Sequence, residues 1–428
     1  MSTRAAPRTT QIIAAVIGNA LEWYDFVVYG FLTVVISRLF FPADSEYASL
    51  LFTMATFGVG FFMRPVGGIL IGMYADRKGR KAALQLIIGL MTLSMAMIAF
   101  APTYAAIGIA APLLILMARL LQGFATGGEF ASATSFLVES APAGKRGFYG
   151  SLQMVGQSLA ALGGAVAGAL VTRMLAPEQL DSWGWRLPFL FGLLIGPVGI
   201  WIRRYLDETE EFVKARQSAE ARLPLGKLLA MNTRAVLTTF GMVISGTISY
   251  YVVLVYMPTF ARTQLNIPLA DAFVAQVIGL LCLTAVIPTF GALSDRIGRK
   301  PILVTALMLY LVGLYPLFSW LHANPTLIHL TIVQAILCSM VGMYFGPIST
   351  ALAEQFPVRM RSTGLAIAYN FAVMMFGGFA QFIVTWLIRE TGSPIAPAYY
   401  VMAGAVAGLV ASVFLVEHGP QRRQQRTN

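Results

Sequence analysis

Five ionisable side chains lie inside long apolar stretches of the sequence. They are Glu22, Asp25, Arg64, Arg119 and Glu129, and all fall in the first third of the chain. A charge at the centre of a membrane span costs roughly 3 kcal/mol or more, so each of these groups needs a partner or a function. Burial favours a neutral carboxylic acid and a nearby arginine favours its ionised form, so such a set is suited to exchanging protons.

The first two acids share one side of a helix. Glu22, Asp25 and Tyr29 are three and four residues apart, and Asn19 extends the same face. One of the two acids is expected to pair with Arg64, and we favour Asp25 as the residue that carries the proton. The predicted proton-exchanging set is Glu22, Asp25, Arg64 and Glu129.

Arg119 has two interpretations. A guanidinium stays charged and binds a carboxylate through two parallel hydrogen bonds, so Arg119 is predicted to bind a carboxylate substrate or to tune a neighbouring acid. The alternative is a permanent ion pair with an acid of the first apolar segment that only fixes helix packing. Glu129 follows Arg119 by about 15 Å along a helix, which indicates a separate role.

Neutral polar groups inside apolar segments complete the predicted binding site. A single buried amide or phenol usually joins helices, and that alternative stays open for each of them. No clustered metal ligands, nucleophile motif or phosphate-binding loop occurs, so neither an enzyme nor a cofactor or metal site is expected. The predicted substrate-binding residues are Asn19, Arg119, Gln122, Gln153, Gln157, Tyr250, Gln334, Tyr369 and Asn370.

The elements that position these residues are membrane spans. The chain has 428 residues, of which 57% are hydrophobic and only 11% charged, with a mean hydropathy of +0.72. This composition is typical of membrane proteins, whose helices need roughly 20 apolar residues each. Spans are predicted near 12–36, 50–74, 82–101, 111–138, 148–174, 186–204, 235–260, 272–293, 302–321, 328–353, 362–388 and 396–416.

The basic residues indicate the orientation. With the N-terminus inside, most of the 30 lysines and arginines fall in cytoplasmic loops, which predicts that both termini are cytoplasmic. The net charge of +11 therefore reflects membrane topology, and no nucleic-acid partner is expected. Only Arg38, Arg173, Arg186, Arg262 and Arg389 would face the other side.

The sequence repeats itself. Gly-Met-Tyr-Ala-Asp-Arg-Lys-Gly-Arg-Lys at 72–81 matches Gly-Ala-Leu-Ser-Asp-Arg-Ile-Gly-Arg-Lys at 291–300, and Glu139, Pro142 and Arg146 recur as Glu354, Pro357 and Arg361. Two similar offsets indicate two homologous halves of six spans in parallel orientation, as in one large transporter class. The predicted parts are a bundle at 1–204, a cytoplasmic linker at 205–234 and a bundle with a short tail at 235–428.

The repeated charges are predicted to form a cytoplasmic gate. A carboxylate beside arginines can pair across neighbouring helix ends in one conformation and separate in another. The alternative is that these residues only hold topology. The predicted gate residues are Asp76, Arg77, Arg80, Glu139, Arg146, Asp295, Arg296, Arg299, Glu354 and Arg361.

These motifs resemble a known family. The repeated Gly-x-x-x-Asp-Arg-x-Gly-Arg-Lys loop looks like the signature of the major facilitator superfamily, and Arg119-Leu-Leu-Gln-Gly resembles its second motif. The stretches 19–26, 63–68, 122–129 and 183–189 resemble its metabolite:proton symporters, with 41–65 most similar to the citrate and tricarboxylate members. The resemblance covers nearly the whole chain.

The resemblance implies a fold and a function. The expected fold is all-α, with 12 transmembrane helices in two pseudo-symmetric six-helix bundles, in a bacterial inner membrane. The expected activity is proton-coupled symport of a small carboxylate, citrate or a related acid, by a monomer. A betaine or proline carrier and sodium coupling are the alternatives.

Overall fold

The computed structural model describes residues 8–78, 80–127, 129–194, 196–198 and 232–417. These residues form helices, and no β-strand occurs among them. The first half contains α1 (Arg8–Phe31), α2 (Thr33–Phe40), α3 (Glu46–Lys78), α4 (Arg80–Ala99), α5 (Tyr104–Ile107), α6 (Ala110–Ala125), α7 (Glu129–Glu139), α8 (Arg146–Met174), α9 (Pro177–Gln179), the π-helix η1 (Leu180–Gly184) and α10 (Arg186–Leu193).

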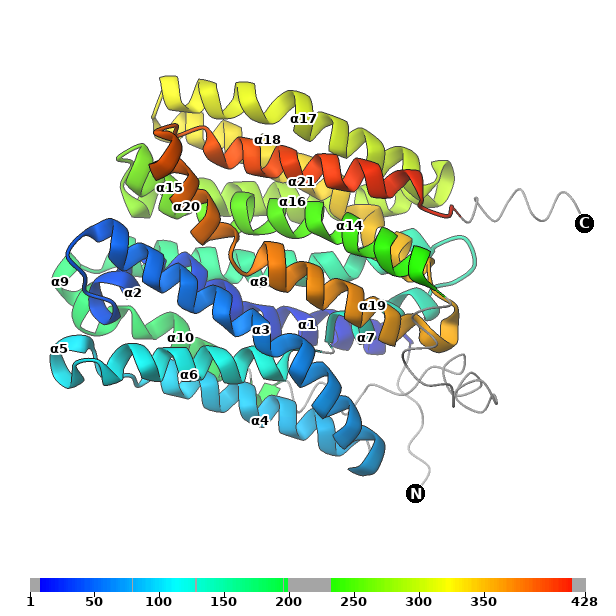
Figure 1. Ribbon diagram of the computed structural model, residues 1–428, viewed down its shortest axis with the longest axis horizontal. Helices are drawn as coiled ribbons and strands as arrows, with labels where there is room; N and C mark the ends of the chain where they lie inside the picture. The colour runs from blue at the N-terminus through cyan, green and yellow to red at the C-terminus, as the bar shows by residue number, and fades with distance from the viewer. Residues whose placement is uncertain (1–7, 79, 128, 195, 199–231, 418–428) are drawn as a thin grey trace, which may run out of the picture.

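The second half has the same character. It contains α14 (Thr233–Ser249), the π-helix η4 (Tyr250–Tyr256), α15 (Met257–Gln264), α16 (Leu269–Ile297), α17 (Arg299–Ala323), α18 (Leu327–Ala353), α19 (Val358–Ala372), the π-helix η5 (Val373–Gly377), α20 (Ala380–Thr391) and α21 (Ala396–Val413). Long helices of both halves run side by side along one direction (Figure 1).

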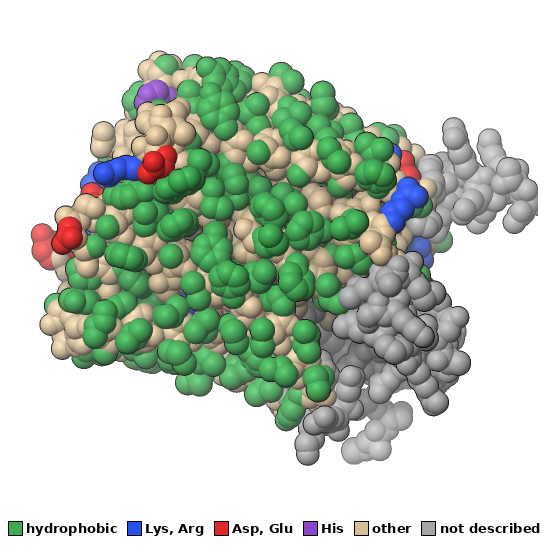
Figure 2. All heavy atoms as spheres, in the orientation of Figure 1, with side chains coloured by type: hydrophobic (Ala, Val, Ile, Leu, Met, Phe, Trp, Pro, Cys, Tyr) green, Lys and Arg blue, Asp and Glu red, His purple; other side chains and the backbone are tan. Residues whose placement is uncertain are grey.

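Within the described residues, ten helices are long and apolar enough to cross a membrane. They match ten of the predicted spans. The predicted third span corresponds to α4, of which 85–99 is the apolar part. The predicted sixth span begins with α10 and continues outside the described residues. Most of the predicted linker also lies outside the described residues. Hydrophobic side chains cover the middle of the face in Figure 2, and charged side chains gather towards its two ends.

The two halves meet along several helix pairs. α8 packs against α16 and α18, α7 against α19, and α3 against η5 and α20. The first half lies below and the second above in Figure 1, with α8 along their boundary. A cavity between the halves is therefore walled by helices from both.

Glycines bring α3 and α6 unusually close. A Cβ on Gly123 would overlap the carbonyl oxygen of Gly60, and one on Gly67 would overlap that of Phe124. Helices in lipid associate by such backbone contacts, because no hydrophobic driving force holds them together. The close approach places Arg64 of α3 and Arg119 of α6 in one buried region.

Several spans are interrupted. α1 ends at Phe31 and α2 begins at Thr33, α6 ends at Ala125 and α7 begins at Glu129, and η4 and η5 lie within the spans 233–264 and 360–391. A π-turn leaves the regular hydrogen-bond ladder and is often found at functional sites. Broken helices at the interface of two repeats are where transporters build their binding sites.

Candidate functional site

Arg64 lies among aromatic rings. Its Cζ atom is 5.2 Å from the ring centroid of Trp23, 4.6 Å from that of Phe26 and 4.4 Å from that of Phe61. Only 2% of Arg64 is exposed. The negative faces of aromatic rings attract a cation and replace part of its lost hydration.

Arg119 has a similar environment. Its Cζ atom is 4.6–4.8 Å from the ring centroids of Phe26, Tyr29 and Phe57, and its Nη1 donates to Oε1 of Gln122. Its Nε and Nη2 have no hydrogen-bond partner among the described residues. The guanidinium is fully buried yet keeps donors to offer.

The carboxylate of Asp25 in α1 faces a different helix from the arginines. A Cβ on Gly192 of α10 would lie 3.0 Å from its Oδ1, so the carboxylate faces α10. No ion pair joins Asp25 to Arg119 in the described part of the chain, and Oδ1 has no hydrogen-bond partner there. The permanent pair with Arg119 considered from the sequence is therefore absent for Asp25 in this conformation.

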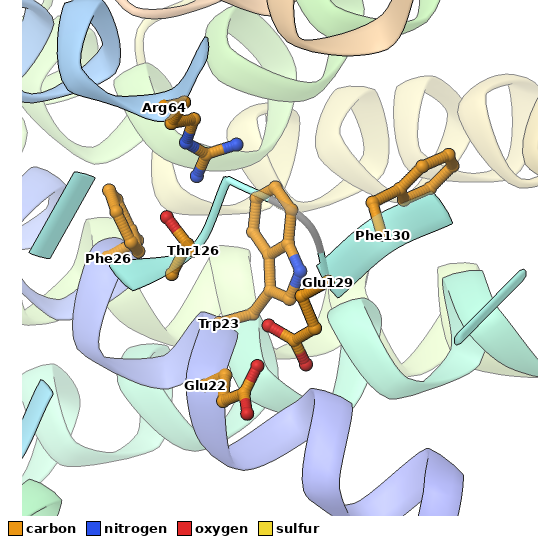
Figure 3. Close-up of a pocket in the computed structure, with 7 residues that line it drawn as sticks. All are labelled: Glu22, Trp23, Phe26, Arg64, Thr126, Glu129 and Phe130. Carbon is orange, nitrogen blue, oxygen red and sulfur yellow. The ribbon is translucent and has the colours of Figure 1, made fainter. Parts of the chain in front are cut away.

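The other predicted acids meet in a small cavity of about 230 Å³, called here the charged hollow. Glu22 of α1 and Glu129 of α7 are far apart in sequence, yet both line it, together with Arg64 (Figure 3). Glu129 therefore lies with Glu22 and Arg64 in a cavity that Arg119 does not line, and a role separate from that of Arg119 stays a prediction. The lining residues are Glu22, Trp23, Phe26, Arg64, Thr126, Glu129 and Phe130.

A second cavity of about 390 Å³, called here the interface hollow, lies between the halves. Its lining includes three side chains with donors that have no partner among the described residues: Nε2 of Gln157 and the hydroxyls of Tyr250 and Tyr251. Every lining residue is neutral. They are Trp23, Phe130, Met154, Gln157, Met242, Val243, Gly246, Thr247, Tyr250, Tyr251, Phe345, Ile348, Leu352 and Tyr369.

Two predicted binding residues bond each other. Asn19 Nδ2 donates to the carbonyl oxygen of Gln153 at 2.9 Å, and Gln153 Nε2 donates to Asn19 Oδ1 at 3.0 Å. Gly156 provides the space that Asn19 occupies. This reciprocal pair joins α1 to α8 and lines neither hollow.

Gln334 of α18 bonds the irregular part of the seventh span. Its Nε2 donates to the carbonyl oxygen of Val253 and to Oε1 of Gln276, both at 2.8 Å. Gln276 Nε2 in turn donates to the carbonyl oxygen of Leu254 at 2.8 Å. Carbonyl groups in a π-helix are left without their regular partners, and the two amides satisfy them. Gln334 therefore supports η4, which carries Tyr250 and Tyr251.

Two further predicted residues join the halves. Asn370 of α19 donates to the carbonyl oxygen of Gly127, where α6 and α7 separate, and Tyr369 stacks on Phe130 with centroids 3.8 Å apart and planes at 5°. The stack lies at the edge of both hollows, because Phe130 lines each of them. α7 and α19 are thus in contact beside the cavities.

Among the described residues of the predicted gate, Arg361 and Glu139 form an ion pair between the halves. Arg361 Nη1 lies 2.9 Å from Oε1 of Glu139, and these side chains are 6% and 3% exposed. Within the second half, Arg299 contacts Asp295 at 3.2 Å and Glu354 at 3.3 Å. We call this end of the bundle the motif end.

Asp295 also reaches across the motif end. Its carboxylate accepts from the backbone N–H groups of Gly147 and Phe148 at 2.7 and 3.0 Å, at the start of α8. A helix N-terminus favours a negative charge. Beside it, the backbone oxygen of Arg146 accepts from Thr350. Arg296 is exposed, and the side chains of Asp76, Arg77 and Arg80 lie outside the described residues.

The halves also touch at the opposite end and at mid-span. The Cζ atom of Arg389 lies 4.7 Å from the ring centroid of Tyr47 at that end, and Phe62 packs on Phe379 near the middle of α3. The interface hollow therefore lies between contacts of the two halves on either side, whereas the charged hollow is lined by the first half.

Residue type alone does not mark several lining residues as part of a site, although Trp23 and Thr126 fall in the stretches 19–26 and 122–129 that resemble the symporters. Trp23, Phe130 and Thr126 occur in apolar stretches where aromatic and small residues are common, so type and spacing alone do not separate them from packing residues. The charged members were found because charge is rare inside a span.

Comparisons with known proteins agree on the kind of protein. Residues 10–222 match the family described as sugar (and other) transporter, and residues 274–428 match the Major Facilitator Superfamily. A citrate-proton symporter of Klebsiella pneumoniae is 38% identical over 97% of this chain and 93% of its own length. A proline/betaine transporter of Escherichia coli K12 is 33% identical over 95% of this chain and 83% of its own. The solved xylose transporter XylE of E. coli has the same fold, with a TM-score of 0.78 at 18% identity, covering 96% of this chain and 98% of that one.

Proposed function

Since the chain belongs to the major facilitator superfamily, and within it to the metabolite:proton symporters, we propose that it takes up a small carboxylate together with protons. It is a transporter and not an enzyme. Citrate or a related tri- or dicarboxylate is the proposed substrate. The proposed site consists of the interface hollow, which receives the substrate, and the buried charges beside it.

The observation that carries this proposal is a surplus of buried donors. Gln157, Tyr250 and Tyr251 each present a donor without an acceptor among the described residues, and Arg119 presents two nitrogens. Buried polar groups in proteins are nearly always paired, and a carboxylate supplies only acceptors. A substrate with several carboxylates matches this set.

The nearby charges give a reason for coupling. Arg64 and Arg119 are buried in the same half as Glu22, Asp25 and Glu129. Protonation of one acid removes a negative charge that repels an anionic substrate. Two unit charges about 6 Å apart interact by ~3 kcal/mol at an effective dielectric constant of about 20, or about a hundredfold in affinity.

A betaine or proline substrate is the second candidate. Trp23, Tyr250, Tyr251 and Tyr369 give the interface hollow an aromatic lining, which suits a quaternary ammonium group, and the proline/betaine relative is also similar. Against it, Arg64 already faces the indole of Trp23 and would repel a second cation. We therefore prefer the carboxylate.

The proposed setting is a bacterial inner membrane, with the motif end and both termini in the cytoplasm. The excess of basic residues on that side supports this orientation. Both hollows lie within one chain, which supports transport by a monomer.

Uptake into liposomes tests the proposal. Purified protein should accumulate labelled citrate when the outside is acidic, and a protonophore should abolish the accumulation. Unlabelled citrate should compete, and betaine or proline should not. Competition by betaine or proline alone would favour the second candidate, and uptake driven by a sodium gradient at equal pH would replace proton coupling by sodium coupling.

A further inference from the structure

Trp23 is shared by the two cavities. It lines both the charged hollow and the interface hollow, and only Phe130 does the same among the lining residues of the two. Glu22, its neighbour in sequence, lies on the charged side, and Tyr250 lies on the interface side. Trp23 is 5% exposed and lies at the boundary of the two hollows.

Trp23 is held in place by contacts with Tyr250 and Arg64. Its ring packs edge-on against Tyr250, with centroids 5.8 Å apart and planes at 64°, and Arg64 lies 5.2 Å from its centroid. In Figure 3 the indole stands between the guanidinium of Arg64 and the carboxylates of Glu22 and Glu129. A proton or an ion does not pass through a packed ring, because the ring leaves no path of water or hydrogen-bonding groups to carry it.

We propose that Trp23 is the partition that ties proton movement to substrate binding. This rests on the proposed symport. While the indole is in place, the carboxylates of Glu22 and Glu129 are separated from the interface hollow. A substrate carboxylate in that hollow competes with the indole for Arg64, since a guanidinium binds a carboxylate more strongly than an aromatic face.

The indole is therefore free to turn only when substrate is bound, and the two hollows then join. In this scheme Glu22 or Glu129, which line the charged hollow, carries the proton in place of Asp25, which faces α10. The proton leaves the same carboxylate as H⁺ on the other side of the membrane, so no co-reactant is needed. Trp23 is a positioning residue in this scheme, and the carboxylates hold the proton.

Proton leak without substrate tests this role. Liposomes with a trapped pH-sensitive dye receive an acid pulse outside in the absence of any organic acid. Trp23→Ala should conduct protons at least tenfold faster than the wild type, and Trp23→Phe, which keeps a ring, should stay close to it. In a second assay, Trp23→Ala should exchange labelled for unlabelled citrate but fail to accumulate it against a gradient.

A matched variant separates the partition from general loosening. Trp185→Ala removes another buried indole, which packs on Phe40 and Phe189 and lines neither hollow. The Trp185→Ala protein should conduct protons no faster than the wild type. Equal leak in both variants, or a tight Trp23→Ala protein, would overturn the proposal. If Trp23→Ala does not fold, Trp23→Leu takes its place. Because the leak is measured without substrate, failure of wild-type citrate uptake refutes the proposed function separately.

Discussion

The ion pair between Arg361 and Glu139 should set which end of the transporter is closed. It is a direct charge contact between α19 and α7, and therefore between the halves, at 2.9 Å. Arg361 Nε also donates to the carbonyl oxygen of Ala353 within the second half. We expect Arg361→Ala and Glu139→Ala each to shift the protein towards a conformation open at the motif end.

The size of the shift follows from burial. The two side chains are 6% and 3% exposed, so removal of one takes this contact away from a charge that stays buried. Loss of one member of a buried ion pair costs up to roughly 3–5 kcal/mol in a folded state, and the other contacts of Arg361 and Glu139 make this an upper value. When the halves separate, water reaches the remaining charge and most of this cost disappears. The ratio of open to closed protein should therefore rise by up to roughly 10²–10⁴.

Distances between spin labels measure this ratio. Lys145→Cys and Val416→Cys place one label on each half near the motif end, where both positions are exposed, in a chain with Cys282 and Cys338 replaced by serine. Arg361→Ala should convert a short distance into a longer one. An unchanged distribution would refute the gate, since the pair would then fix only topology.

The charge-reversed protein is the control for this experiment. Glu139→Arg combined with Arg361→Glu re-creates the pair with its signs exchanged, and the short distance should return. If each single variant opens the motif end and the double variant stays open as well, the effect comes from local packing and not from the pair.

Three further results are expected. Arg119→Ala should abolish citrate uptake while membrane insertion stays normal. Near-normal transport would mean that Arg119 does not belong to the binding site. Gln334→Leu should raise the KM for citrate several-fold with little change in protein yield, because the Val253 carbonyl oxygen of η4 loses the bond that Gln334 Nε2 donates. An equal KM would mean that η4 holds Tyr250 and Tyr251 without this bond. Gly123→Ala should lower the thermal unfolding temperature in detergent by several degrees, since its methyl group overlaps the α3 backbone; an unchanged temperature would contradict the close packing of α3 and α6.

The fold was largely predictable because its signals are long and repeated. Apolar segments of spanning length and a duplicated motif predicted two bundles, and the family matches confirm the major facilitator fold. The π-turns were not predicted. The turn at Tyr250–Tyr256 depends on amides that Gln276 and Gln334 contribute from other helices, and such partners are known only once the helices are packed.

Only the charged residues of the site could be predicted from the sequence to line a cavity. Arg64 and Glu22 were found from their cost in lipid, and both line the charged hollow. Which neutral amides face a cavity depends on helix rotation, which one sequence does not fix. Asn19 and Gln153 were predicted to bind substrate, but here they bond each other, and the binding role stays a prediction. The same limit applies to Trp23, which lies in the stretch 19–26 that resembles the symporters but whose place beside a cavity does not follow from its type.

The two halves contribute different chemistry to the transport cycle. The charged hollow is lined entirely by the first half, and every side chain that the second half contributes to the interface hollow is neutral. When the halves rock, the second half carries its hydroxyls away from the substrate but moves no charged side chain that lines either hollow. For the proposed anionic substrate, the electrostatic hold at the hollows therefore comes from the first half. Loss of the proton from an acid of the first half adds a negative charge beside such a substrate, and we expect this step to weaken the hold and promote release.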